Sequence, residues 1–270
     1  IYGLEYAFYF IKVSKKLIIA NKETIVCGGK FFLFKAKSLG CNIVSIDSEH
    51  FCLNEILKKN KLSKIDKVYL TASGGPFLNK KINEISKINF KYALKHPKWK
   101  MGKKISIDSS TLANKGLEVI EASYLFNLKA DKIKIKIHKE SNVHSIVIFK
   151  NGLVHLVAHN TSMLIPIENV LVGNKILYNN NIFLSQKKTF KFTFDEINLK
   201  KFKMVSLAYK SLKYGPRCCI FYNVINDYLV DLYLKDEIFY YEITYKLNKV
   251  INNTKLLPYF KKNIKIFNDI

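Results

Sequence analysis

The sequence predicts an α/β protein in which a mixed sheet is followed by a C-terminal helical region. Its first 46 residues alternate between helical segments and short, continuously apolar segments, which is typical of parallel strands covered on both faces. Residues 132–159 instead alternate apolar and polar positions around an Asn-Gly pair, which indicates an antiparallel hairpin with one wet face. From residue 202 onward the apolar spacing becomes helical.

The expected elements follow from these patterns in order. The first part should hold an amphipathic helix at its start, a strand at 16–20, a helix at 31–39 and a strand at 41–46. A strand at 68–70 should run into a loop at 71–77, and a strand at 104–108 should lead into a helix at about 111–127. We expect further strands at 132–138, 143–150 and 153–159, with the turn at Asn151-Gly152. Residues from about 174 to 200 are rich in Asn and Lys and indicate a linker.

Composition excludes several classes of protein. Hydrophobic residues make up 49% of the 270 residues, so the chain is not disordered despite a net charge of +24. The basic residues include a single arginine, Arg217, and the lysines are spread over the chain. We therefore expect a solvated lysine surface that attracts small anions and no nucleic-acid partner, with a polyanion footprint as the alternative.

The cysteines and the apolar runs carry further expectations. Five cysteines without a CxxC pair indicate neither a disulfide framework nor a structural zinc site, and they fit a reducing compartment. No apolar run reaches the ~20 residues of a membrane span, so no membrane partner is expected. The chain begins with Ile and no signal-like segment opens it, so we expect a trimmed N-terminus.

Two carboxylates stand where an apolar strand ends. Strand alternation would place Asp47 and Glu49 on one side of the chain, at the edge where open α/β sheets bind ligands. Such oxygen ligands suit Mg²⁺ or Mn²⁺. A solvated loop or a helix cap is the alternative interpretation of the pair.

A polar stripe runs along the helix expected near residue 118. At 100° per residue Asn114, Glu118 and Glu121 fall within a narrow stripe that apolar side chains flank on both sides. Buried carboxylates need a cation or donors, so the stripe should face a metal and substrate or a buried paired network. An exposed face with a Lys115–Glu118 ion pair is the alternative.

Two loops indicate a phosphate site. Ser73-Gly74-Gly75 follows a strand, and glycine tolerates the positive φ with which backbone N–H groups surround an anion. Ser109, Ser110 and Thr111 precede the expected helix, where they would cap its positive end, and Lys115 adds a charge. The only tryptophan, Trp99, lies in a loop bounded by Pro and Gly, which indicates either a lid over a ligand or a surface anchor.

These residues resemble a known family, the 1-deoxy-D-xylulose 5-phosphate reductoisomerases, which depend on NADPH and a divalent metal. The resemblance rests on Ala20-Asn21-Lys22-Glu23, on Ile46 to His50, on Leu70 to Phe77, on residues 96–121 and on Ile137-His138 to His144-Ser145, in the family's order and spacing. It covers roughly residues 1–170. It implies a partial Rossmann-like dinucleotide domain (1–46), an α+β catalytic domain with a mixed sheet (47–173), a linker (174–201) and a C-terminal helical domain (202–270).

The resemblance also implies roles for individual residues. It makes Asp47, Glu49 and Glu118 the ligands of Mn²⁺ or Mg²⁺, and it counts them with Lys22 and His96 as catalytic. It assigns substrate contacts to Lys22, Ser48, Glu49, Ser73, His96, Trp99, Ser109, Asn114, Lys115 and Glu118. It assigns the NADPH site to Asn21, Glu23, Met101 and Gly102, with Trp99 and Met101 in a flexible lid.

The implied reaction has two stages. The metal holds the C2 and C3 oxygens of a phosphorylated ketose while the C3–C4 bond breaks and the fragments rejoin as a branched aldehyde. NADPH then delivers hydride and gives 2-C-methyl-D-erythritol 4-phosphate, a step of non-mevalonate isoprenoid biosynthesis. The resemblance further implies a homodimer.

Departures from the family shape the remaining expectations. The glycines form no dinucleotide-binding turn, so we expect the chain as given to bind NADPH poorly. The family's HPQS appears as His138 to Ser141, and its Asn-Ala-Ala-Asn-Glu appears as Asn223-Val224-Ile225-Asn226-Asp227. The lysine-rich variants favour a parasite plastid stroma, with the bacterial cytoplasm as the alternative. A degenerate non-enzymatic remnant of the same fold, acting as a subunit, is the alternative function.

Overall fold

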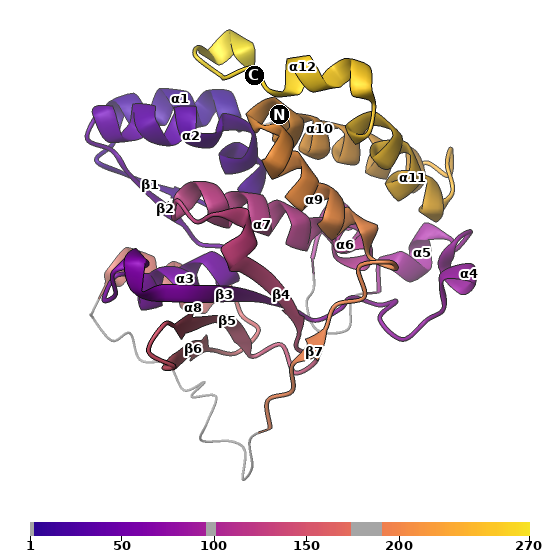
Figure 1. Ribbon diagram of the computed structural model, residues 1–270, viewed down its shortest axis with the longest axis horizontal. Helices are drawn as coiled ribbons and strands as arrows, with labels where there is room; N and C mark the ends of the chain where they lie inside the picture. The colour runs from indigo at the N-terminus through magenta and orange to yellow at the C-terminus, as the bar shows by residue number, and fades with distance from the viewer. Residues whose placement is uncertain (1–2, 96–100, 174–190) are drawn as a thin grey trace.

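The computed structural model describes residues 3–95, 101–173 and 191–270. It contains a small two-stranded sheet, a five-stranded sheet and a group of C-terminal helices (Figure 1). The expected α/β class, mixed sheet and C-terminal helical region are therefore confirmed. A complete dinucleotide-binding domain is not part of the architecture that these residues form.

The N-terminal unit has the expected order of helix, strand, helix and strand. Its elements are α1 (Leu4–Val13), β1 (Lys16–Ile19), α2 (Lys22–Ser38) and β2 (Asn42–Ser45), and the two strands pair in parallel. Helix α2 begins at Lys22 rather than at residue 31, and it is kinked at Gly29, where φ is +54°. The Gly28-Gly29 pair lowers helix propensity and hides the first turns of α2 in the sequence pattern.

The larger sheet has the strand order β6-β5-β3-β4-β7. Strands β3 and β4 are parallel, whereas β5 is antiparallel to β3 and β6, and β7 is antiparallel to β4. The Asn-Gly hairpin joins β5 to β6 as expected, with Gly152 at φ +85°. The bounds of the strands are β3 (Ile65–Ala72), β4 (Ile133–Ile137), β5 (Val143–Phe149), β6 (Val154–Ala158) and β7 (Asp195–Glu196).

The expected strand at 104–108 is wrong. These residues belong to helix α6 (Lys103–Thr111), which Leu112, at φ +58°, separates from helix α7 (Ala113–Leu125). Alternating Ile105 and Ile107 resemble a strand in the sequence, but Lys104 pairs with Asp108 four residues later, a contact that a helix provides. Tertiary contacts therefore decide the local structure here.

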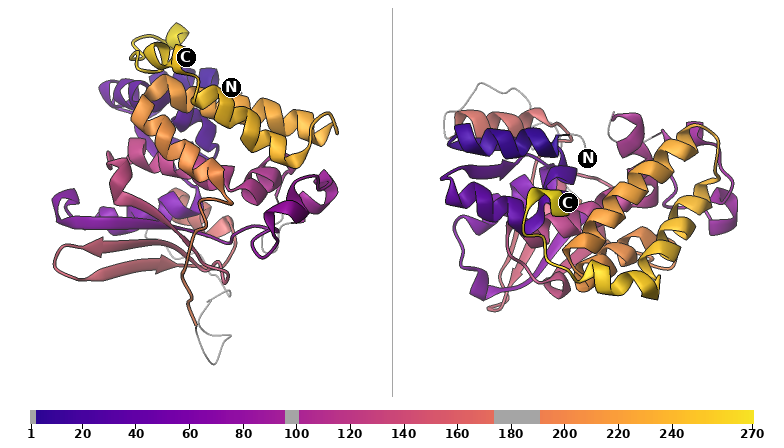
Figure 2. Two further views of the ribbon diagram at one scale, coloured as in Figure 1. Left: turned by 45° about the vertical axis from the view of Figure 1, so that its right-hand side comes forward. Right: turned by 90° about the horizontal axis from the view of Figure 1, so that it is seen from above.

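The remaining helices complete the layers. Helix α3 packs on β5 and β6, and α9, α10 and α11 form the C-terminal helical region above α7 (Figure 1). Phe8 of α1 contacts Phe267, with ring centroids 5.1 Å apart, so α1 and the C-terminal segment lie side by side (Figure 2). The bounds are α3 (Ser48–Leu57), α4 (Ile82–Ile85), α5 (Phe90–Ala93), α8 (Leu164–Val172), α9 (Lys203–Tyr214), α10 (Pro216–Leu234), α11 (Tyr240–Ile251) and α12 (Leu257–Phe260).

Helix α7 is the centre of the molecule. Leu117 and Ile120 pack into a core formed with α2 and the C-terminal helices. Val119 and Ala122 pack into a second core against the larger sheet. Since both faces of α7 are buried, the polar side chains on this helix have little freedom to move. In the parts of the chain that are described, no helix combines the length and apolarity that crossing a membrane requires.

We expect Gly116→Ala to destabilise the fold by about 1 to 3 kcal/mol because it overpacks this centre. A Cβ at Gly116 would lie 2.3 Å from the Tyr222 hydroxyl and 3.0 Å from Ala208 Cβ. Urea unfolding of Gly116→Ala, Tyr222→Phe and the double variant measures the effect. The two substitutions should couple, because Tyr222→Phe removes the nearest clashing atom; additive free energies of unfolding would contradict this packing.

Candidate active site

A cavity of about 260 Å³ opens where several chain segments end. The ends of β1, β2 and β3 contribute to it, together with α6, α7 and the start of β5. The residues predicted from the sequence that line it are Lys22, Asp47, Ser48, Glu49, Ser73, Met101, Ser109, Asn114, Lys115 and Glu118. Residues far apart in the sequence thus converge as expected.

Three carboxylates form one wall of this cavity. Asp47, Glu49 and Glu118 each present an oxygen, and these oxygens all lie within 4.8 Å of one another. The strand alternation expected for Asp47 and Glu49 is wrong, since β2 ends at Ser45 and Asp47 caps helix α3. The Asp47 side chain accepts a hydrogen bond from the Glu49 backbone N–H at 3.2 Å. The first turn of a helix therefore directs both carboxylates to one place.

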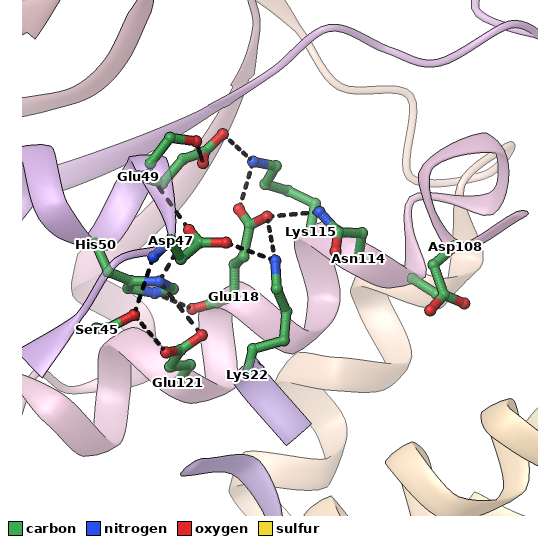
Figure 3. Close-up of polar contacts among 12 residues, drawn as sticks. Lys22, Ser45, Asp47, Glu49, His50, Asp108, Asn114, Lys115, Glu118 and Glu121 are labelled. Atoms are coloured by element: carbon green, nitrogen blue, oxygen red, sulfur yellow. Dashed lines mark hydrogen bonds and ion pairs between the residues drawn. The ribbon is translucent and has the colours of Figure 1, made fainter. Parts of the chain in front are cut away.

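Two buried lysines neutralise part of this charge (Figure 3). The Lys22 ammonium lies 2.7 Å from Asp47 Oδ2 and 2.9 Å from Glu118 Oε1. The Lys115 ammonium lies 2.8 Å from Glu49 Oε1 and also pairs with Glu118 Oε2. The Asn114 amide donates a hydrogen bond of 2.6 Å to Glu118 Oε1. The exposed ion pair considered for Lys115 and Glu118 is wrong, because Glu118 is only 1% exposed.

The protonation of the cluster follows from burial and neighbouring charge. Burial opposes the charge of Lys22, but Asp47 and Glu118 outweigh it and raise its pKa well above the usual value. Burial also opposes ionisation of Asp47, yet Lys22 and His50 hold its pKa well below the usual range. Burial and the Glu49 charge raise the pKa of Glu118 against both lysines. Glu118 is therefore the carboxylate that most needs a further cation.

This donor set fits a divalent metal. Three carboxylates face two ammonium groups, so one negative charge remains without a counter-ion. A divalent cation would neutralise this charge and would stabilise the ionised form of the buried Glu118. Carboxylate oxygens are the ligands that Mg²⁺ and Mn²⁺ prefer. Asp47, Glu49 and Glu118 are the residues that would hold the ion.

A second layer of polar groups supports the carboxylates. His50 Nδ1 lies 3.1 Å from Asp47 Oδ1 and 3.3 Å from Glu121 Oε2, and His50 Nε2 donates to the Glu118 carbonyl at 3.0 Å. Both ring nitrogens thus face acceptors, which an imidazolium satisfies. Burial opposes this charge, but Glu121 and Asp47 outweigh it and raise the pKa of His50 to about 9. Ser45 donates to Glu121 Oε1 at 2.9 Å, so Glu121 turns to His50 and not to the cavity.

Sequence reasoning did not identify His50 or Ser45 as part of the site. His50 stands in the same short segment as Asp47 and Glu49, which is the one signal that points to it. Its partner Glu121 lies on α7, and this contact depends on the fold. The stripe predicted on α7 is thus divided between two layers, with Glu118 in the cavity wall and Glu121 behind it.

Hydroxyl groups from the loop after β3 and from α6 form a further wall of the cavity, the hydroxyl wall. Gly74 and Gly75 adopt φ of +87° and +66°, as the anion loop requires, and the Gly75 N–H donates to Ser73 Oγ at 3.3 Å. A Cβ at Gly75 would approach the Ser109 carbonyl to 2.7 Å, so this loop packs closely on α6. Residues 109–111 end α6, and only the Thr111 hydroxyl accepts from the backbone of α7, at Ala113 N–H. The expected cap by all three hydroxyls is therefore wrong, although Ser109 lines the cavity.

Of the four expected cofactor residues, only Met101 lines the cavity. Asn21 precedes α2 and donates to Thr24 Oγ1 at 2.7 Å, while Glu23 pairs with Lys104 at 2.6 Å. Gly102 precedes α6, and Met101 lines the cavity beside it. The NADPH contacts of these four residues stay a prediction. His96 and Trp99 lie outside the described residues, and so does the main part of the expected lid.

His144 lines the cavity and stacks on His159. The rings of His144 and His159 lie 4.0 Å apart, and His144 Nε2 donates to the His159 carbonyl at 3.3 Å. Burial, together with the charge of a protonated His159, lowers the pKa of His144 to about 3. Burial also lowers the pKa of His159. This pair is therefore uncharged at neutral pH.

We expect His144 to make the protein less stable in mild acid. In the unfolded chain this residue binds a proton below about pH 6.5, whereas in the folded chain it binds one only near pH 3. Between these values the unfolded chain holds the extra proton, so acid favours unfolding. The loss between pH 6.5 and pH 5 should be about 2 kcal/mol. Urea unfolding at pH 7 and pH 5 measures it, and His144→Phe should remove that part of the pH dependence. The exposed His155→Phe variant is the control and should keep it.

Fold and site together define an α/β chain whose cavity combines three carboxylates suited to a divalent metal with lysines suited to an anionic group. Residues 43–126 match the family described as "1-deoxy-D-xylulose 5-phosphate reductoisomerase C-terminal domain", and residues 159–267 match "DXP reductoisomerase C-terminal domain". The chain is 39% identical over 271 residues to the 1-deoxy-D-xylulose 5-phosphate reductoisomerase of Clostridium novyi (strain NT), covering 99% of this chain and 68% of the relative. The chain belongs to the 1-deoxy-D-xylulose 5-phosphate reductoisomerase family.

Further comparisons agree on the fold. The enzyme of Clostridium tetani is 40% identical over 89% of this chain and 63% of its own length. A crystal structure of DOX-P reductoisomerase in complex with NADPH, fosmidomycin and magnesium matches with a TM-score of 0.89 and 32% identity, covering 97% of this chain and 66% of that chain. The chain thus spans about two thirds of the length of these relatives. Both named relatives are bacterial and give no support to the plastid expectation.

Proposed function

We propose that the chain carries the metal and substrate site of an enzyme that converts 1-deoxy-D-xylulose 5-phosphate into 2-C-methyl-D-erythritol 4-phosphate. The observation that carries the proposal is that one cavity is lined by three carboxylates, two buried lysines and several hydroxyl groups. Such a cavity offers one end to a metal-bound pair of oxygens and the other to a phosphate. A sugar phosphate with vicinal oxygens has both.

Asp47, Glu49 and Glu118 would hold Mn²⁺ or Mg²⁺, and the bound metal supplies Lewis acidity toward neighbouring substrate oxygens. The chain's own residues do the rest of the orientation. Lys22 and Ser48 line the cavity beside the carboxylates and would hold the substrate oxygens there. With the carboxylate charge shared by a metal, the Lys22 ammonium is available to a developing negative charge on oxygen.

The phosphate would bind where hydroxyl groups line the cavity. Ser73 and Ser109 would offer hydroxyl donors there, and Asn114 and Lys115, which contact Glu118, would add an amide and a positive charge. Holding the phosphate keeps both fragments of the substrate in place after its carbon–carbon bond breaks, so binding energy at a group that does not react becomes catalytic.

NADPH belongs to the proposal for the whole enzyme. The chain has no glycine-rich dinucleotide turn, and of the four predicted cofactor residues only Met101 lines the cavity. The described residues therefore do not make a complete dinucleotide site, and we derive no hydride step from them. Asn21, Glu23, Met101 and Gly102 would contribute one edge of such a site.

We further propose that the chain forms a homodimer through the edge strand β6. This strand has one neighbour in the sheet that the described residues form, Val154 and Leu156 are exposed on one of its faces, and Leu153 just before it is exposed too. Exposed apolar edges of this type are available for pairing with a second chain.

The dimer is tested by light scattering of the protein as it elutes from a size-exclusion column. The parent chain should give twice the mass of one chain, and Leu156→Lys should give the mass of one chain.

Calorimetric titration of the chain with fosmidomycin, the ligand of the matching crystal structure, tests the proposed function. We expect binding in the presence of Mn²⁺ and none after the metal is removed with a chelator. Binding that depends on the metal would assign the catalytic half-site to this chain. A folded chain that binds neither Mn²⁺ nor fosmidomycin would contradict the proposal and favour the non-enzymatic remnant.

A further inference from the structure

A charged cluster outside the cavity joins three helices. Lys104 of α6 is at its centre, and the Lys104 ammonium lies 2.6 Å from Glu23 Oε1, 3.1 Å from Asp108 Oδ2 and 3.6 Å from Asp227 Oδ1. The Asn226 amide donates to Asp108 Oδ1 at 2.7 Å. We call Glu23, Lys104, Asp108, Asn226 and Asp227 the Lys104 cluster. Figure 3 shows Asp108 apart from the contacts of the carboxylate wall.

The interior of the cluster is closed to water. The Asp108 side chain is 2% exposed and Asn226 is fully buried, whereas Lys104 and Glu23 are partly exposed. Burial raises the pKa of Asp108 against the charge of Lys104 and the hydrogen bond from Asn226. A buried carboxylate is stable only while such partners hold it, so Asp108 fixes α6 relative to α10.

The position of the cluster connects it to the cavity. Glu23 directly follows Lys22 on α2, and Asp108 directly precedes Ser109 on α6. Lys22 and Ser109 line the carboxylate wall and the hydroxyl wall of the cavity, respectively. Among the described residues that line the cavity, none belongs to α10. The cluster thus joins α10 by polar contacts to α6, which carries Ser109, and to the first turn of α2.

We propose that Lys104 and Asp108 are positioning residues that couple α10 to the substrate-binding wall through Ser109. This inference rests on the proposed function of the cavity. Because α6 meets α7 at a sharp break, where Leu112 has φ +58°, a shift of α6 need not be transmitted to α7. The metal ligands lie on α3 and α7 or at their ends, whereas Ser109 lies on α6. Loss of the cluster should therefore weaken fosmidomycin binding and leave metal binding unchanged.

Asp108→Asn is the most specific variant. Asparagine has the size of aspartate and keeps an oxygen that accepts the hydrogen bond from Asn226, but it cannot form the ion pair with Lys104. Lys104→Met removes the same ion pair from the other side, and Lys104→Arg restores a charge. The exposed neighbour Lys103→Met is the matched control. Calorimetry measures Mn²⁺ affinity and then fosmidomycin affinity for each, and peptide hydrogen exchange follows residues 103–112.

We expect about a 10-fold or greater loss of fosmidomycin affinity in Asp108→Asn and Lys104→Met, with Mn²⁺ affinity within about 2-fold of the parent chain. Lys104→Arg should recover a part of the loss, and Lys103→Met should lose nothing. Exchange should become faster over residues 103–112 and stay unchanged over residues 48–57.

Either of two results would overturn the inference. One is that hydrogen exchange over residues 103–112 stays unchanged in folded Asp108→Asn and Lys104→Met. The cluster would then not position α6, whether or not the parent chain binds fosmidomycin. The other is an equal loss of Mn²⁺ and fosmidomycin affinity, which means a global defect. A parent chain that binds no fosmidomycin contradicts the proposed function, and the exchange result then still decides whether the cluster positions α6.

Discussion

Glu118→Gln should lower the affinity of the chain for Mn²⁺ by at least about 100-fold, because it removes a carboxylate ligand. Even the loss of a residue that only hydrogen-bonds to a metal ligand lowers metal affinity by about 10- to 100-fold. Charge adds to this loss. In the parent chain three carboxylates face Lys22 and Lys115, whereas in the variant two carboxylates face the same two lysines. The site then has no excess negative charge to offer a divalent cation. Fosmidomycin binding that depends on the metal should disappear with it.

Calorimetry with Mn²⁺ measures this effect on folded protein. Glu55→Gln is the control, since Glu55 lies on α3 at the surface and pairs with Lys58 at 2.5 Å. It removes the same charge from the chain and should leave Mn²⁺ affinity unchanged. Equal Mn²⁺ affinity in Glu118→Gln and Glu55→Gln would place the metal elsewhere.

Lys22→Met should destabilise the metal-free protein by about 3 to 5 kcal/mol, because it leaves the buried carboxylates of Asp47 and Glu118 without their shared cation. A divalent metal supplies that charge again. Mn²⁺ should therefore recover most of the loss, and it should stabilise Lys22→Met by more than it stabilises the parent chain.

Urea unfolding with and without Mn²⁺ gives the four free energies that this comparison needs. At a metal concentration of 100 times Kd, binding alone adds about 2.7 kcal/mol to the free energy of unfolding. Lys58→Met, at an exposed position of the same region, is the control and should behave as the parent chain does. If Mn²⁺ stabilised Lys22→Met no more than Lys58→Met, Lys22 would not be the counter-ion of the metal site.

The sequence predicted the features of the site that depend on regular geometry. Helical spacing brought Asn114 and Glu118 to one face, and the glycines of the loop after β3 indicated its positive φ values. The Asn-Gly turn and the order of the first four elements were also predictable, because local propensity and tertiary structure agree there.

Other features depend on contacts between distant segments. Residues 104–108 alternate like a strand, and the buried helix face depends on contacts such as that of Asp108 with Asn226, 118 positions away. The division of the stripe on α7 follows from His50, whose ring lies between Asp47 and Glu121. No spacing rule could assign Glu118 to the cavity and Glu121 to the layer behind it.

The separation of the site residues along the chain has a consequence for folding kinetics. Lys22 and Glu118 are 96 positions apart, and Lys115 and Glu49 are 66 apart. Closing such long loops costs entropy that only a nearly assembled core repays, so the site should form late, after the rate-limiting barrier. Mn²⁺ should then slow unfolding and leave the refolding rate unchanged. Binding of the metal would then occur only after this part of the chain has been synthesised and has folded.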